Sequence, residues 1–146
     1  MKEMMSFVAW AGRNTMSASI EPVSAATAVV RYSVYVPVPS LPEEDCDDLA
    51  LQFVVNGPVV PRVGERLEFD GARGNNLSLV VSEVSHTFGI KSPGATDRAK
   101  VFVTADIDDS PLSIAGARKL LEPAALYQWV SEFEMLEFPE HLRRCL

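Results

Sequence analysis

The feature that most constrains the fold is the segment Leu77–Phe88, in which the alternation of apolar residues changes phase part-way. The first half alternates over Leu77–Val81, and the second half alternates over Val84–Phe88, one residue out of step. A β-bulge produces such a slip, because one extra residue in a strand leaves two residues opposite one on the partner. The pattern predicts a bulge near Ser82-Glu83, and strands bent in this way let a small sheet curl toward a barrel.

Other apolar runs surround this segment. Arg66–Phe69 precedes it and Lys100–Ile107 follows it, each with apolar residues on one face. Upstream, Thr27–Val38 alternates for longer, and Leu49–Val55 is largely apolar. Alternation rich in β-branched and aromatic residues is typical of strands. The sequence therefore predicts an antiparallel meander of about five strands over residues 27–107.

The pattern becomes helical after residue 109. Ser110 followed by Pro111 predicts a helix start, because serine caps free N–H groups and proline suits the first helical position. Pro123 can open a second helix, and a last turn is expected after Pro139. The apolar side of the second helix would contain residues at three- and four-residue spacing: Leu126, Trp129, Val130, Phe133 and Leu136.

These elements fit one domain, because a chain of 146 residues can bury a core without a disulfide or a metal. We expect residues 1–22 to be a loosely attached N-terminal segment and residues 23–146 to form the domain. The meander would occupy 27–107 and a helical tail 110–146. The predicted class is α+β: a bent antiparallel sheet, partly closed into a barrel, with one or two C-terminal helices.

Three short runs carry a resemblance to a known kind of domain. They are Pro61–Leu67, Leu79–His86 and Val101–Val103. Together they resemble the small SH3-like barrels of bacterial and phage proteins, over about 50 residues in all. The resemblance implies that the turn at Gly64 and the bent strand close a barrel. It implies no catalytic residue.

The net charge of −7 is unevenly distributed. Residues 41–56 carry five acids and no base, and residues 106–146 carry eight acids against four bases. An acidic chain repels phosphate, so nucleic acid is a disfavoured partner. The leading hypothesis is a non-catalytic binding or regulatory module that acts through protein–protein contacts. A basic protein partner would meet the acidic loop residues: Glu43, Glu44, Asp45, Asp47 and Asp48.

Two further function classes stay open. Arg62, Arg66, Arg73 and His86 could form a barrel face that binds single-stranded nucleic acid or a small ligand. Acids such as Glu65 interleave with these bases and offset their charge. In the third class, His86 would be the general base of an enzyme, but the sequence shows no nucleophile motif beside it. No catalytic residue is assigned.

Metal and cofactor sites are not expected. Asp106 and Asp108 share a face at a strand end, but the spacing of calcium loops and of zinc sites is absent. Cys46 and Cys145 are interpreted as free thiols in a reducing cytoplasm, and a single bridge between them is the alternative.

No apolar run approaches the roughly 20 residues that span a bilayer, and no signal peptide is recognisable. We expect a cytoplasmic protein. A homodimer is a further hypothesis, since Thr27–Val36 could form an exposed edge strand.

Overall fold

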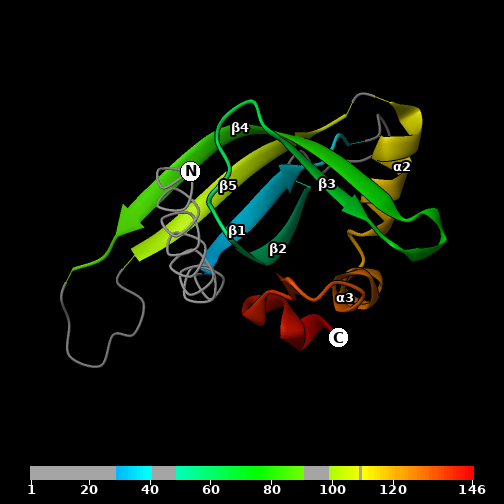
Figure 1. Cartoon of the computed structure of the whole chain (residues 1–146). Coiled ribbons are helices and arrows are strands. Elements are labelled where there is room, and N and C mark those ends of the chain that lie inside the picture. Colours follow the sequence, from blue (N-terminus) through cyan, green and yellow to red (C-terminus); the bar gives the residue numbers. More distant parts are fainter. Residues whose placement is uncertain (1–28, 41–48, 91–98, 109) are drawn as a thin grey trace, which may run out of the picture.

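The structure, a computed structural model, describes residues 29–40, 49–90, 99–108 and 110–146. It contains a six-stranded sheet in the order β3-β4-β5-β1-β2-β6, which curls into half a barrel (Figure 1). The strands are β1 (Val30–Pro37), β2 (Ala50–Gly57), β3 (Arg66–Asp70), β4 (Asn76–Phe88), β5 (Ala99–Ile107) and β6 (Leu136–Glu137). The helices are α2 (Pro111–Lys119) and α3 (Pro123–Ser131), and two short 3-10 segments are η1 (Ala72–Gly74) and η2 (Glu140–Cys145). The α+β class is confirmed.

The sheet is mixed rather than wholly antiparallel. β1 pairs with β5 in parallel, with Val34 opposite Val103, while the other neighbouring strands pair antiparallel. β1 therefore lies inside the sheet, between β5 and β2. The expectation of an exposed edge at Thr27–Val36 is wrong for the described part of that range, because β1 has a partner on each side.

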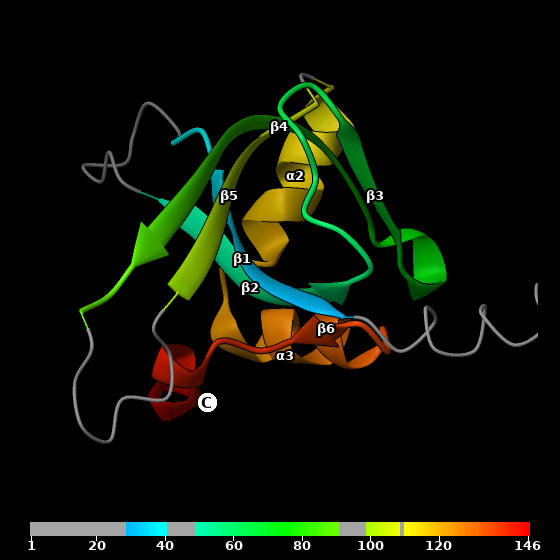
Figure 2. The ribbon, with the colours of Figure 1, turned by 60° about the vertical axis from the view of Figure 1, so that its left-hand side comes forward.

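The bulge in β4 is confirmed. The register with β5 passes from Val81 opposite Ala105 to Glu83 opposite Thr104, so Ser82 is the extra residue. The Ser82 hydroxyl donates to the Thr104 carbonyl oxygen at 3.1 Å, which holds the bulged residue against β5. We call Asn76–Val81 the proximal half of β4 and Ser82–Phe88 its distal half. Figure 2 shows the sheet curving around α2, with the distal half extending beyond it.

The core lies on the inner face of this curved sheet. Buried residues alternate with more exposed ones in β1 and in the first half of β4, while Phe53–Val55 of β2 are buried in succession. The core includes Val34, Phe53, Leu79 and Val103. Ser110 caps α2 as predicted, since its hydroxyl accepts from the Ser113 backbone N–H at 3.2 Å.

The second predicted helix is also present, although it is shorter than the pattern suggested. α3 buries Leu126, Trp129 and Val130, but it ends at Ser131, so Leu136 reaches the core from β6 instead. Four aromatic rings join this helix to the sheet in edge-to-face contacts, with centroid distances of 5.0–6.2 Å. They are Phe53, Phe69, Trp129 and Phe133.

The loop between β3 and β4 is fastened to α3 by polar contacts. The Trp129 indole Nε1 donates to the Asn75 carbonyl oxygen at 2.9 Å, and the Ala72 backbone N–H donates to Glu132 Oε2 at 3.2 Å. Gly71 sits at the closest approach, where a Cβ atom would collide with the Asn75 carbonyl oxygen and press on the Trp129 indole. Position 71 therefore requires glycine, because there is no space for a Cβ atom.

Candidate outer-face binding pocket

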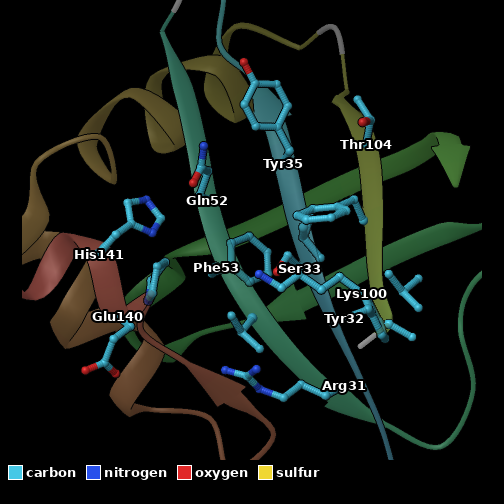
Figure 3. Close-up of a pocket in the computed structure, with 16 residues that line it drawn as sticks. Arg31, Tyr32, Ser33, Tyr35, Gln52, Phe53, Lys100, Thr104, Glu140 and His141 are labelled. Atoms are coloured by element: carbon cyan, nitrogen blue, oxygen red, sulfur yellow. The ribbon is translucent and has the colours of Figure 1, made fainter. Parts of the chain in front are cut away.

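A pocket of about 550 Å³ opens on the outer face of the sheet, opposite the core. β1, β2 and β5 form its floor, and the start of η2 forms one wall (Figure 3). We call it the outer pocket. The lining residues that the strand register places on the outer face, together with those of the η2 wall, are Arg31, Ser33, Tyr35, Gln52, Val54, Lys100, Phe102, Thr104, Pro139, Glu140 and His141.

Strand register determines how the floor is built, because residues opposite each other in neighbouring strands point to the same face. Ser33 lies between Val54 and Phe102 in one such row. In the next row, Tyr35 lies between Gln52 and Thr104. Small hydroxyl residues therefore alternate with larger ones across the three strands, which leaves hollows between the side chains.

Two aromatic side chains border these hollows from different strands. Tyr35 of β1 is 37% exposed and Phe102 of β5 is 41% exposed, and both line the outer pocket. On the opposite face, Val34 and Val36 flank Tyr35 in β1 and Val103 follows Phe102 in β5, and all three are buried, so the backbone at both aromatic residues is held firmly. Rigid, half-exposed aromatic groups beside a hollow can pack against an incoming side chain with little loss of conformational entropy.

Charged groups of both signs surround the aromatic pair. The Arg31 Nε donates to Glu137 Oε2 at 3.0 Å, an ion pair that links β1 to β6 across β2. Both side chains are about half-exposed, so this pair contributes little to stability. Figure 3 places Lys100 on the β5 side and Glu140 and His141 on the η2 side. The pocket therefore offers cationic, anionic and aromatic contacts within one hollow.

His141 is the histidine among the residues that line the outer pocket. Among the described residues, no hydrogen bond joins His141 to the hydroxyl of Ser33 or of Thr104. A general base has to reach the proton that it removes, and the described geometry shows no such pair. The described residues also contain no group of three or more His, Cys, Asp or Glu that could hold a metal ion.

The residues proposed from the sequence as a ligand face lie on other parts of the chain, and Arg66 and His86 stand on opposite faces of the sheet. Arg62 is exposed in the turn before β3, and Arg66 begins β3, where its Nη1 donates to the Ser78 hydroxyl at 3.4 Å. Arg73 lies in η1. His86 lies in the distal half of β4 on the opposite face from Arg66, exposed and opposite Val101. None of these residues lines the outer pocket.

The acidic loop residues Glu43, Glu44, Asp45, Asp47 and Asp48 lie outside the described residues, as does Cys46. Cys145 is free and exposed at the end of η2. The helices described are not long and apolar enough for any of them to cross a membrane.

Sequence reasoning missed Tyr35 and Phe102 as site residues. The alternation in β1 and β5 places Tyr35 and Phe102 on the face opposite the buried residues, and this pattern could have indicated them. What the sequence could not show is that these two strands, 69 positions apart at the Ser33–Phe102 pairing, are neighbours. The contribution of Glu140 and His141 was likewise invisible, because it depends on where η2 lies over the sheet.

Comparison with known proteins gives no identification. No family model matches the chain, and neither the curated proteins nor the solved structures contain a match. The resemblance to SH3-like barrels stays a prediction from the sequence, and functional inference depends on the outer pocket itself.

Proposed function

We propose that this protein is a non-catalytic binding module that recognises a protein partner through the outer pocket. The observation that carries the proposal is the pairing of Tyr35 and Phe102, both half-exposed, around a hollow of about 550 Å³. Tyrosine and other aromatic anchors beside pockets dominate the binding energy of protein interfaces, and arginine is the other frequent contributor. Arg31 lies in the same pocket.

The size of the outer pocket supports a polypeptide ligand. Pockets of roughly 300–1,000 Å³ accommodate drug-sized molecules, and the same volume takes one or two large side chains of a partner. The hollow lies open on a sheet face. An extended segment could therefore cross it and insert individual side chains between Tyr35 and Phe102.

The balance of charge favours a polypeptide over nucleic acid. Arg31 and Lys100 are cationic, but Glu137 pairs with Arg31 and Glu140 lines the opposite wall. Binding to a nucleic-acid backbone depends on several cations that release counterions from phosphate. Here Arg31 pairs with Glu137 and Arg143 pairs with Glu140, so Lys100 is the one cation in excess among these side chains. A segment that carries both apolar and charged side chains matches the outer pocket better.

The acidic loop belongs to the same proposal through long-range attraction. Its five carboxylates, Glu43, Glu44, Asp45, Asp47 and Asp48, would attract a basic partner and raise the association rate. Neutralising all five should slow association in a salt-dependent manner and leave dissociation unchanged. If the wild type and the neutralised variant associate with the partner at the same rate at low salt, the acidic loop has no part in binding.

The test uses a displayed library of random peptides selected on the wild-type protein. We expect selected peptides to bind the wild type and to bind Tyr35→Ala and Phe102→Ala at least about ten-fold more weakly, as hot-spot residues do. The matched control is Val63→Ala, which truncates a 64% exposed apolar side chain that does not line the outer pocket. Circular dichroism establishes that each variant is folded.

Two outcomes would overturn the proposal. One is a set of selected peptides that bind the folded Tyr35→Ala/Phe102→Ala double variant as tightly as the wild type. The other is a labelled single-stranded oligonucleotide that binds the wild type and loses affinity on Phe102→Ala, while no peptide is enriched. That second result would assign the face to nucleic acid.

A further inference from the structure

The distal half of β4 has a partner strand on one side only. β3 pairs with β4 over Asn76–Val80. The turn before β3 continues this pairing at Val81: the Gly64 N–H donates to the Val81 carbonyl oxygen at 2.8 Å, and the Val81 N–H donates to the Glu65 carbonyl oxygen at 2.9 Å. Within the described ranges, Ser82–Phe88 pairs with β5 and with no strand on its other edge. Figure 2 shows this part of β4 running past the helices.

The direction of the backbone groups along this edge follows from the register. The Asp108 N–H donates to the Ser78 carbonyl at 3.3 Å, so even-numbered β5 residues direct their backbone groups toward β4. Beyond the bulge, those residues lie opposite Glu83, Ser85 and Thr87. The alternate residues Val84, His86 and Phe88 therefore present their N–H and C=O groups to the free edge.

The two edge strands of the sheet, β3 and β6, carry more features that discourage pairing than this segment does. β3 is five residues long and carries exposed Arg66, Glu68 and Asp70. β6 has only two residues, and Pro139 follows soon after it. Short edges, charges and proline are the usual protection of sheet edges. Ser82–Phe88 contains one charge, no proline, and residues that favour strands.

We propose that a second copy of this chain pairs antiparallel with this edge, about a two-fold axis at His86. Such an interface uses the same residues on both copies. Val84 would then lie opposite Phe88 of the second copy, and Ser85 opposite Thr87 of the second copy. Val84, His86 and Phe88 of each chain would exchange backbone hydrogen bonds with the same residues of the second copy, and the two sheets would become continuous.

The side chains are self-complementary in this register. Phe88 is 78% exposed, and it would gain Val84 of the second copy as an apolar neighbour on the inner face. The hydroxyls of Ser85 and Thr87 would meet on the outer face, and Glu83 would lie opposite Gly89, away from any acid. An axis at Ser85 would instead place Val84 opposite His86 and leave Phe88 against Ser82. The axis at His86 is preferred because it pairs apolar with apolar residues.

The two-fold axis is perpendicular to the sheet, so both outer pockets would open on the same side of the joined sheet. The strand pairing covers a small area compared with that of permanent dimers, so the dimer is expected to depend on protein concentration. This inference does not rest on the proposed function, since it concerns a different part of the surface.

The register is tested by disulfide trapping in the full chain, with Cys46→Ser and Cys145→Ser as background. Ser85→Cys and Thr87→Cys are made in separate chains and mixed under mild oxidation. In the proposed register these two positions face each other in a non-hydrogen-bonded pair, where side chains approach most closely and a disulfide fits. We expect a covalent dimer in the mixture and at most trace amounts from either variant alone.

Sedimentation of the unmodified protein over a concentration series supplies the second measurement. His86→Glu would place two carboxylates opposite each other at the axis, and its exposed position should leave the fold intact. We expect this variant to sediment as a monomer at concentrations where the wild type dimerises. Leu112→Glu adds the same charge at an exposed site in α2, outside the distal half of β4 and the turn that flanks it, and should dimerise like the wild type.

Several results would overturn the proposal. Efficient trapping of Ser85→Cys alone would place the axis at Ser85 instead. A wild type that is monomeric at the highest concentration, without trapping in the mixture, would exclude pairing. A dimer that persists in His86→Glu and is not trapped would assign dimerisation to another surface.

Discussion

The two halves of β4 belong to one strand, but their side chains differ in burial. In the proximal half, Leu77, Leu79 and Val81 are fully buried and alternate with partly exposed residues. In the distal half, only Val84 is partly buried, and the remaining residues are exposed on both faces. β5 accompanies both halves, so pairing with β5 does not account for the difference.

What differs is the layer against the inner face. α2 packs against β4, and Figure 2 shows the sheet curving around this helix in the proximal half. Beyond Ser82 the helices no longer follow the strand. The bulge therefore divides β4 into a part that is packed in the core and a part that is exposed in the described structure.

The largest expected effect tests this division directly. Leu79→Ala removes a side chain with 0% exposure and should lower the free energy of unfolding by about 2–5 kcal/mol, because the surrounding core cannot fully close the cavity. His86→Ala, at an exposed position in the distal half, should change it by no more than about 0.5 kcal/mol. Urea unfolding measures both. Similar losses for the two variants would contradict the division.

The second prediction concerns the loop that leads into the proximal half. Gly71→Ala places a Cβ atom against the Asn75 carbonyl and the Trp129 indole, so we expect a loss of about 1–3 kcal/mol in unfolding free energy. Gly116→Ala is the matched control, since its Cβ would meet only the Asn76 carbonyl oxygen at 3.9 Å. In helix α2 that change should stabilise by about 0.5–1 kcal/mol. The midpoint of thermal unfolding should therefore fall in Gly71→Ala and rise in Gly116→Ala. Equal shifts in the two variants would refute the steric argument.

A smaller effect is expected at the contact between α3 and this loop. Trp129→Phe keeps an aromatic ring near Phe53 and Phe69 but removes the hydrogen bond from Nε1 to the Asn75 carbonyl. The lost hydrogen bond and the smaller ring should together lower the unfolding free energy by about 1–2 kcal/mol. Amide hydrogen exchange should accelerate in the η1 loop and remain unchanged in the distal half of β4. Acceleration across both halves would show that they are coupled.

The smallest effect separates the two faces of β1 and depends on pH. Burial raises the pKa of the Tyr32 hydroxyl, because the ionised form is poorly solvated in the core. Its contribution to stability is fully present below the unfolded-state pKa, near 10, and is lost as the pH rises through the higher folded-state pKa. Wild-type stability should thus fall above about pH 10, and Tyr32→Phe should reduce that fall.

The control for this prediction is Tyr35→Phe, which changes the next tyrosine along β1 on the outer face. Chemical denaturation at several alkaline pH values would compare the three proteins. A decline of equal steepness in the wild type and in Tyr32→Phe would show that burial of Tyr32 is not its source.

The elements predicted best are those with a local cause. The bulge at Ser82 leaves a phase slip within a few residues, and the start of α2 needs only Ser110 and Pro111. Pro123 marks the start of α3 for the same reason. Each depends on neighbours in the chain, which the sequence contains directly.

The features that were missed depend on distant segments. Nothing near Val34 indicates that its neighbour is Val103 or that the two strands run parallel. The outer pocket shares this limit, because Tyr35 and Phe102 become neighbours only through that pairing. The sequence singled out three arginines and His86 by residue type, and residue type alone does not reveal which side chains share a hollow.

The parallel pairing of β1 with β5 also has a consequence for the order of folding. β1 pairs with β2, and β3 pairs with β4 and β4 with β5, within two units whose connections are 5–12 residues long. Contact between β1 and β5 closes a much longer stretch, because 61 residues separate these two strands. Long closures cost more chain entropy and slow folding. We expect the two units to form first and the pairing between β1 and β5 to form last. Val34 and Val103 pair with each other in this late contact, and with Phe53 and Val84 within the two units. Truncating either should then accelerate unfolding more than it slows folding, while Leu67→Ala, within one unit, should mainly slow folding.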